Sequence, residues 1–183
     1  VASRGLGDVY KRQRLVFGLL FFVNLHVFSQ NLDETKKNII KSIENHEEEI
    51  IKISDKIWEL AETAFNEYES SKLLSDYAEA NGFSLERGVA GMPTAFIATY
   101  GQGRPVISVL GEFDALPGLS QDTTPTKKPL TEGGNGHGCG HNLFGAASLA
   151  SAIAIKEQIE NGDLKGTIKS VSYTHLTLPT IYS

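Results

Sequence analysis

Residues 133–142 (GGNGHGCGHN) constrain this chain more than any other segment, because three side chains that bind metals lie there within five positions. His137, Cys139 and His141 alternate with glycines. Imidazole and thiolate are ligands that zinc and neighbouring ions prefer. Glycine lacks side-chain bulk, so this backbone can take unusual dihedrals that bring Cys139 and His141 onto one ion. The segment therefore predicts a metal site.

A long helix is expected directly after this segment, over residues 142–160, where Ala and Ser predominate. The positive end of its dipole would favour the thiolate form of Cys139. Two alternatives are a glycine-rich turn with incidental histidines and a purely structural zinc knuckle. The knuckle is disfavoured because the remaining histidines, His26, His46 and His175, do not provide a second Cys/His pair.

Two carboxylates follow a predicted strand upstream. Residues 106–110 form an apolar run, and Glu112 and Asp114 come next at a spacing of two. If the strand persists, both carboxylates point the same way. Such a pair suits metal binding, or the orientation of a ligand imidazole. Ordinary turn chemistry at a strand end before Pro117 is the alternative.

The amino-terminal half is predicted to be helical. Apolar residues spaced by three and four predict an amphipathic helix over residues 32–64. They are Ile39, Ile43, Ile50, Ile53, Ile57, Leu60 and Ala61. On this helix we expect Trp58 to pack in the core rather than to form a substrate platform, and His46 to be exposed.

A second helix is predicted over residues 70–81. Ser70 and Ser71 are its expected capping residues, and Gly82 followed by apolar Phe83 makes a typical carboxyl-terminal cap.

Strands alternate with helices after this point. Residues 94–100 and 105–110 are β-rich and are predicted to be neighbouring strands. The helix over residues 142–160 should end at Asn161 and Gly162, and a further strand should begin at Gly166. This order of elements predicts an α/β domain, a mixed sheet with helices packed on it.

The two ends of the chain differ from the segment between them. Residues 1–13 and 170–183 resemble translated sequencing-adapter read-through, so we expect a non-native flank and tail; a genuine β-rich terminus is the alternative for the latter. Residues 14–29 have a basic start, an apolar middle and a small residue, Ser29, which is typical of a secretory signal peptide. The apolar stretch is shorter than the roughly 20 residues of a membrane span. An exported protein, periplasmic or secreted, is expected; an uncleaved anchor and a buried helix are the alternatives.

Charge limits the partners. The net charge is −5, and lysine and arginine do not cluster. This composition gives no electrostatic footprint for nucleic acid or anionic lipid, so we expect a small-molecule or peptide substrate. Cys139 is the single cysteine, which excludes an internal disulfide.

Residues 111–121 (GEFDALPGLSQ) and 133–150 (GGNGHGCGHNLFGAASLA) together resemble the amidohydrolase branch of the aminoacylase and glutamate-carboxypeptidase metallopeptidases. The resemblance extends over residues 38–169. It implies that residues 30–169 are the amino-terminal half of a zinc-peptidase domain, without the family's inserted dimerisation domain. The remaining ligands and the general-base glutamate are expected beyond residue 169, so the chain alone is expected to be inactive.

The resemblance also implies roles for individual residues. Cys139 and His141 would bind one or two divalent ions, zinc or manganese, and Asp114 would support the metal centre. Glu112 stands where more distant relatives carry a ligand histidine. Three further residues are candidates for contacting and orienting the metal ligands without binding the ion themselves: Glu112, His137 and Asn142.

The implied reaction is hydrolysis of an N-acyl or N-aroyl amino acid, such as p-aminobenzoyl-glutamate, or of a dipeptide, by metal-activated water. A dipeptidase or aminoacylase of the same family and a non-catalytic homologue used for binding are the alternatives. The complete protein is expected to be a homo- or hetero-oligomer.

Overall fold

The computed structural model describes the backbone of residues 6–173 and side chains from residue 33 onward. The chain divides into two compact units, Val1–Asn38 and Ile39–Ser183. Helix α1 (Leu6–Leu60) includes the backbone of the proposed signal peptide, whose side chains lie outside the described residues. Among the residues described, no helix is long and apolar enough to cross a membrane.

The part of α1 that belongs to the second unit packs mostly through the predicted face. Ile53 and Ile57 are buried in the core, as expected, but Ile43 is 45% exposed. His46, predicted to be exposed, instead faces inward: its Nδ1 atom lies 2.7 Å from the Tyr77 hydroxyl, and its Nε2 atom lies 3.0 Å from a Glu157 carboxylate oxygen. That prediction was wrong because both partners are supplied by other helices.

Helix α2 (Tyr68–Ala80) begins without either predicted serine cap. Its first turn is capped by the Glu62 carboxylate, which accepts the N–H groups of Glu69 at 3.1 Å and Ser70 at 2.8 Å. The predicted carboxyl-terminal cap is confirmed: Gly82 has a φ of +84°, and Phe83, only 4% exposed, donates its N–H to Ala78.

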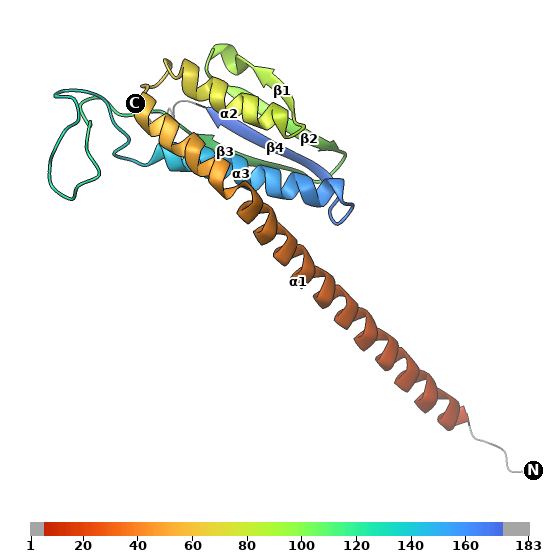
Figure 1. Cartoon of the computed structure of the whole chain (residues 1–183). Helices are drawn as coiled ribbons and strands as arrows, with labels where there is room; N and C mark the ends of the chain where they lie inside the picture. Colours follow the sequence, from red (N-terminus) through yellow and green to blue (C-terminus); the bar gives the residue numbers. More distant parts are fainter. Residues whose placement is uncertain (1–5, 174–183) are drawn as a thin grey trace, which may run out of the picture. The chain divides into compact units, whose positions relative to one another are not determined.

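The described sheet has four strands in the order β1-β2-β4-β3. They are β1 (Ser84–Arg87), β2 (Phe96–Gln102), β3 (Val106–Glu112) and β4 (Gly166–Tyr173), and a short 3-10 helix, η1 (Val89–Gly91), joins β1 to β2. β2 is antiparallel to β4, and β3 is parallel to it. The prediction that β2 and β3 are neighbours was therefore wrong, because β4, which follows a crossover helix, inserts between them (Figure 1).

That crossover helix is α3 (His141–Glu160), which begins and ends within a residue of its predicted bounds. Figure 1 shows α2 and α3 beside the sheet, and both contact it and each other. Gly145 allows the close approach of α3 to β3, since a Cβ there would lie 2.9 Å from Phe113 Cβ. The predicted α/β fold with a mixed sheet is confirmed.

The first four residues of the proposed non-native tail are part of β4, whose residues alternate between buried and half-buried positions. Ser170 and Ser172 are each 1% exposed, and their hydroxyls have no hydrogen-bond partner among the described residues. The origin of this segment stays a prediction.

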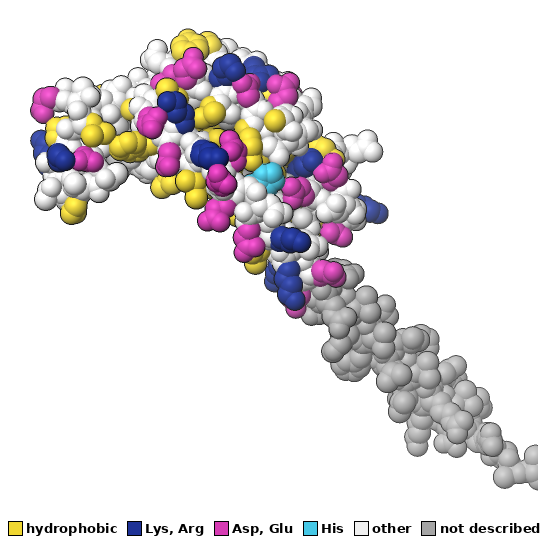
Figure 2. Space-filling model, viewed as in Figure 1, with side chains coloured by type: hydrophobic (Ala, Val, Ile, Leu, Met, Phe, Trp, Pro, Cys, Tyr) yellow, Lys and Arg dark blue, Asp and Glu magenta, His cyan; other side chains and the backbone are white. Residues whose placement is uncertain are grey.

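Acidic and basic side chains are interspersed over the face of the molecule shown in Figure 2. The exposed ion pair between Lys52 and Glu48, 2.8 Å apart on α1, is of the kind that contributes little to stability.

Candidate metal centre

The two carboxylates of the GEFDALPG segment lie on either side of one imidazole. His141 Nδ1 is 2.8 Å from Asp114 Oδ1, and His141 Nε2 is 3.3 Å from Glu112 Oε2. Phe113, between them in sequence, points the other way and is fully buried. The spacing of two thus puts both carboxylates on one side of the backbone, as the sequence predicted.

These contacts are made where β3 ends and α3 begins. Glu112 is the last residue of β3, and His141 is the first residue of α3. Both carboxylates are largely buried, with Glu112 7% and Asp114 8% exposed. Solvent therefore screens the contacts between these carboxylates and His141 only weakly.

Imidazole and carboxylate are side chains of the types that bind divalent cations. A carboxylate that accepts one imidazole N–H fixes the ring and makes the other nitrogen a better ligand, which is the usual arrangement behind a metal-binding histidine. Asp114 is placed to do this at Nδ1 of His141, and Glu112 contributes an oxygen near Nε2.

Cys139 occupies the exposed part of the loop as a free thiol. Gly140, between Cys139 and His141, has a φ of +83°, a left-handed conformation that favours glycine. Within the described part of the chain, no group of three or more His, Cys, Asp or Glu side chains has metal-binding geometry. A shared ion on Cys139 and His141 therefore stays a prediction.

His137 and Asn142 fasten the glycine-rich loop to α1. His137 Nε2 lies 3.0 Å from the carbonyl oxygen of Ile57, and the Asn142 amide donates to the Ser54 hydroxyl at 3.2 Å. Burial lowers the pKa of His137, with only partial compensation from its hydrogen bond to Ile57, so the ring stays neutral at pH 7. Both side chains face α1, and their contacts fix the position of the glycine-rich loop.

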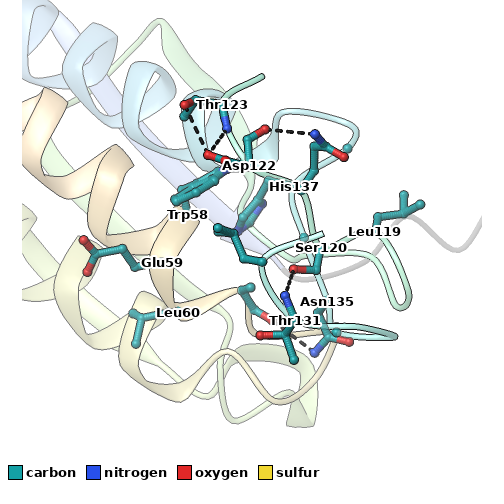
Figure 3. Close-up of a pocket in the computed structure, with 16 residues that line it drawn as sticks. Trp58, Glu59, Leu60, Leu119, Ser120, Asp122, Thr123, Thr131, Asn135 and His137 are labelled. Atoms are coloured by element: carbon teal, nitrogen blue, oxygen red, sulfur yellow. Dashed lines mark hydrogen bonds between the residues drawn. The ribbon is translucent and has the colours of Figure 1, made fainter. Parts of the chain in front are cut away.

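A pocket of about 550 Å³ adjoins the loop, between the end of α1 and residues 119–138. Trp58, His137 and Asp122 are among the residues that line it (Figure 3). Trp58 was expected in the core; it is half-buried and forms part of the pocket wall instead.

Sequence reasoning missed Glu67, which precedes α2 and is fully buried. Burial raises the pKa of its carboxyl to about 7, and the negative charge of Asp114 adds to this rise, while backbone groups and Thr94 oppose it. A single glutamate between two helices gives no periodic signal, so only the fold reveals that it is buried.

Comparison with known proteins identifies several relatives. The chain is 45% identical over 141 residues to a subunit of the p-aminobenzoyl-glutamate hydrolase of Escherichia coli, covering 75% of this chain and 29% of that protein. It is 32% identical over 136 residues to thermostable carboxypeptidase 2 of Saccharolobus solfataricus, covering 73% and 32%. It is 26% identical over 140 residues to the mouse Xaa-Arg dipeptidase, covering 71% and 29%.

Solved structures share the fold. A dinuclear metal-binding peptidase of the M20 family from Bacillus subtilis has a TM-score of 0.59 and 25% identity, over 70% of this chain and 35% of that one. A structure from methicillin-resistant Staphylococcus aureus, described as an aminohydrolase, has a TM-score of 0.64 and 23% identity, over 78% and 36%. No family model matches the chain. The chain spans about a third of the length of the curated relatives that it matches.

Proposed function

We propose, because this chain belongs to the M20 peptidase family, that the complete protein is a metal-dependent amidohydrolase acting on N-acyl or N-aroyl amino acids. The observation that carries the proposal is the imidazole of His141 held between Asp114 and Glu112. A carboxylate that orients an imidazole in this way is the usual arrangement behind a metal-binding histidine.

His141 and Cys139 are the residues that would hold the ion, zinc or manganese, and a dinuclear centre is compatible with the M20 peptidase of B. subtilis. When bound, such an ion lowers the pKa of a water molecule and polarises an amide carbonyl. Asp114 orients the ring through Nδ1, and Nε2, which lies 3.3 Å from Glu112 Oε2, is the atom that would bind the ion. His137 and Asn142 hold the loop at a fixed distance from α1.

We propose p-aminobenzoyl-glutamate or a similar N-aroyl amino acid as the substrate, on the strength of the 45% identity to the E. coli hydrolase subunit. Dipeptides are the second candidate, because an Xaa-Arg dipeptidase is also a relative. A panel of N-aroyl amino acids, N-acyl amino acids and dipeptides separates these specificities by kcat/KM. No turnover across the panel by metal-loaded protein would favour a non-catalytic homologue.

Assembly and location are part of the proposal. The E. coli relative is named as one subunit of its hydrolase, which supports an oligomer with a second kind of subunit. Residues 14–29 support export by a signal peptide. Mass determination of the mature amino terminus tests the second point, since cleavage near Ser29 would remove the apolar stretch.

The sharpest test of the metal centre is Cys139→Ala in the complete protein. Cys139 is the only cysteine in this chain. The variant should lose bound metal and amidase activity together, measured by elemental analysis and by product release. Ser151→Ala, at an exposed position of α3, is the control and should retain both. If Cys139→Ala retains both metal and activity, Cys139 is not part of the site.

A further inference from the structure

The turn between α1 and α2, residues 61–67, touches both segments of the candidate metal centre. The Glu62 carbonyl accepts the N–H of Ala115 at 2.7 Å, directly after Asp114. The Ala61 carbonyl accepts the side-chain amide of Asn135, in the glycine-rich loop, at 3.2 Å. The position of this turn is therefore coupled to the position of both segments.

The backbone of the turn is strained. Ala61 has a φ of +44° and Phe65 a φ of +68°, in the left-handed region that residues other than glycine rarely adopt. Such conformations are unfavourable for residues other than glycine, and they persist where surrounding contacts hold them. The surrounding fold, rather than the backbone preference of Ala61 and Phe65, therefore holds the turn against Ala115 and Asn135.

Glu67 ends this turn with a side chain that is 0% exposed. Its Oε2 atom accepts the hydroxyl of Thr94, itself fully buried, at 3.0 Å. Its Oε1 atom has no hydrogen-bond partner among the described residues. Burying a carboxyl group in these surroundings costs free energy. An apolar side chain could fill the same space without that cost, so packing alone does not explain a glutamate at position 67.

We propose that Glu67 is a positioning residue for the metal centre, which acts on it through Asp114 and the turn at residues 61–67. The inference rests on the proposed function, because it gives Glu67 a role only if a cation binds at His141. The negative charge of Asp114 raises the pKa of Glu67, and the Glu62 carboxylate is directed to the first turn of α2.

Charge explains how Glu67 would act. Below neutral pH it holds its proton, since burial raises its pKa to about 7. Above neutral pH Glu67 also becomes charged and adds to the negative potential behind the ion. Metal affinity should therefore contain a pH-dependent contribution that comes from Glu67 alone.

The test measures the affinity of the complete protein for Zn²⁺ by chelator competition between pH 5.5 and pH 8. Wild type is compared with Glu67→Gln, which keeps the shape of the side chain but cannot ionise. We expect the ratio of the two association constants to be near one at pH 5.5 and to rise up to about tenfold by pH 8, the factor that corresponds to one pKa unit. A ratio that stays constant over this range overturns the proposal.

Two further variants separate positioning from stability. Thr94→Val removes the hydrogen bond that favours ionised Glu67, so the pH-dependent rise in affinity should move to higher pH; an unchanged midpoint counts against the proposal. Asn81→Ala, at the other end of α2, removes the hydrogen bond from the Asn81 amide to the Tyr77 carbonyl at 2.8 Å and should lower the melting temperature, while the pH profile of Zn²⁺ affinity stays that of the wild type. If Asn81→Ala reproduces the profile of Glu67→Gln, the effect is structural and the proposal fails.

The failure of this inference can be told from failure of the proposed function. Wild-type protein that binds no stoichiometric Zn²⁺ overturns the metal centre itself. Normal binding by wild type with a constant ratio overturns the role of Glu67 only.

Discussion

His46 Nε2 lies 3.0 Å from the Glu157 carboxylate, a contact that joins α1 to α3 across 111 positions of sequence. The other ring nitrogen of His46 lies 2.7 Å from the Tyr77 hydroxyl of α2. One side chain therefore ties together all three long helices of the second unit.

We expect His46→Ala to lower the free energy of unfolding by about 1–3 kcal/mol, because it leaves partly buried groups of Tyr77 and Glu157 without their partner. Urea denaturation followed by circular dichroism measures the change. The control is Glu48→Ala, on the exposed face of the same helix, which should have little effect. Equal stabilities for His46→Ala and wild type would show that the contact contributes nothing.

Ser172→Ala should stabilise the chain by up to about 1 kcal/mol, because the Ser172 hydroxyl is buried without a hydrogen-bond partner among the described residues. Ser148→Ala is the matched comparison: its hydroxyl donates to the Leu110 carbonyl at 2.8 Å, so its removal should destabilise by about 1 kcal/mol. Thermal unfolding should give shifts of opposite sign. A loss of stability in Ser172→Ala would mean that the hydroxyl is satisfied in solution.

Gly145→Ala should disturb the site through packing. The added Cβ would lie 2.9 Å from Phe113 Cβ and 3.0 Å from the Glu112 carbonyl oxygen, so α3 has to move away from β3. Overpacking of this kind costs about 1–3 kcal/mol, and it would shift Glu112 relative to His141. Unfolding and Zn²⁺ titration of the complete protein should both show a loss. Unchanged values for both would mean that the helix adjusts freely.

Glu67 gives the stability of the chain a pH dependence of known sign. Its pKa is about 7 in the folded state and 4.5 as the ordinary value, so the folded state binds the proton more tightly. Stability from this group is therefore greatest below pH 4.5 and falls as the pH rises from 4.5 to 7. Denaturation of wild type and Glu67→Gln across this window should show a smaller fall for the variant. Parallel curves would show that Glu67 titrates normally.

Local signals in the sequence predicted local structure well. The bounds of α3, the cap at Gly82 and the shared side of Glu112 and Asp114 follow from spacing and from residue preferences within a few positions. These features depend on helix and strand periodicity and on cap residues, which can be read from a short window of sequence. The family was predicted from a resemblance carried by two short motifs, residues 111–121 and 133–150.

Features that depend on distant partners could not be predicted. The inward position of His46 depends on Tyr77 and Glu157, 31 and 111 residues away. The burial of Glu67 depends on Thr94, 27 residues away. The place of β4 between β2 and β3 is likewise a property of the whole sheet, which no window of sequence contains.

The strand order also bears on how the chain is made. β4 is the last described strand in the sequence, yet both β2 and β3 use it as their hydrogen-bonding partner. During synthesis neither strand can pair with β4 until residues 166–173 have left the ribosome, so both present open edges while α3 is being translated. A nascent chain halted before Gly166 should therefore be captured by chaperones or aggregate.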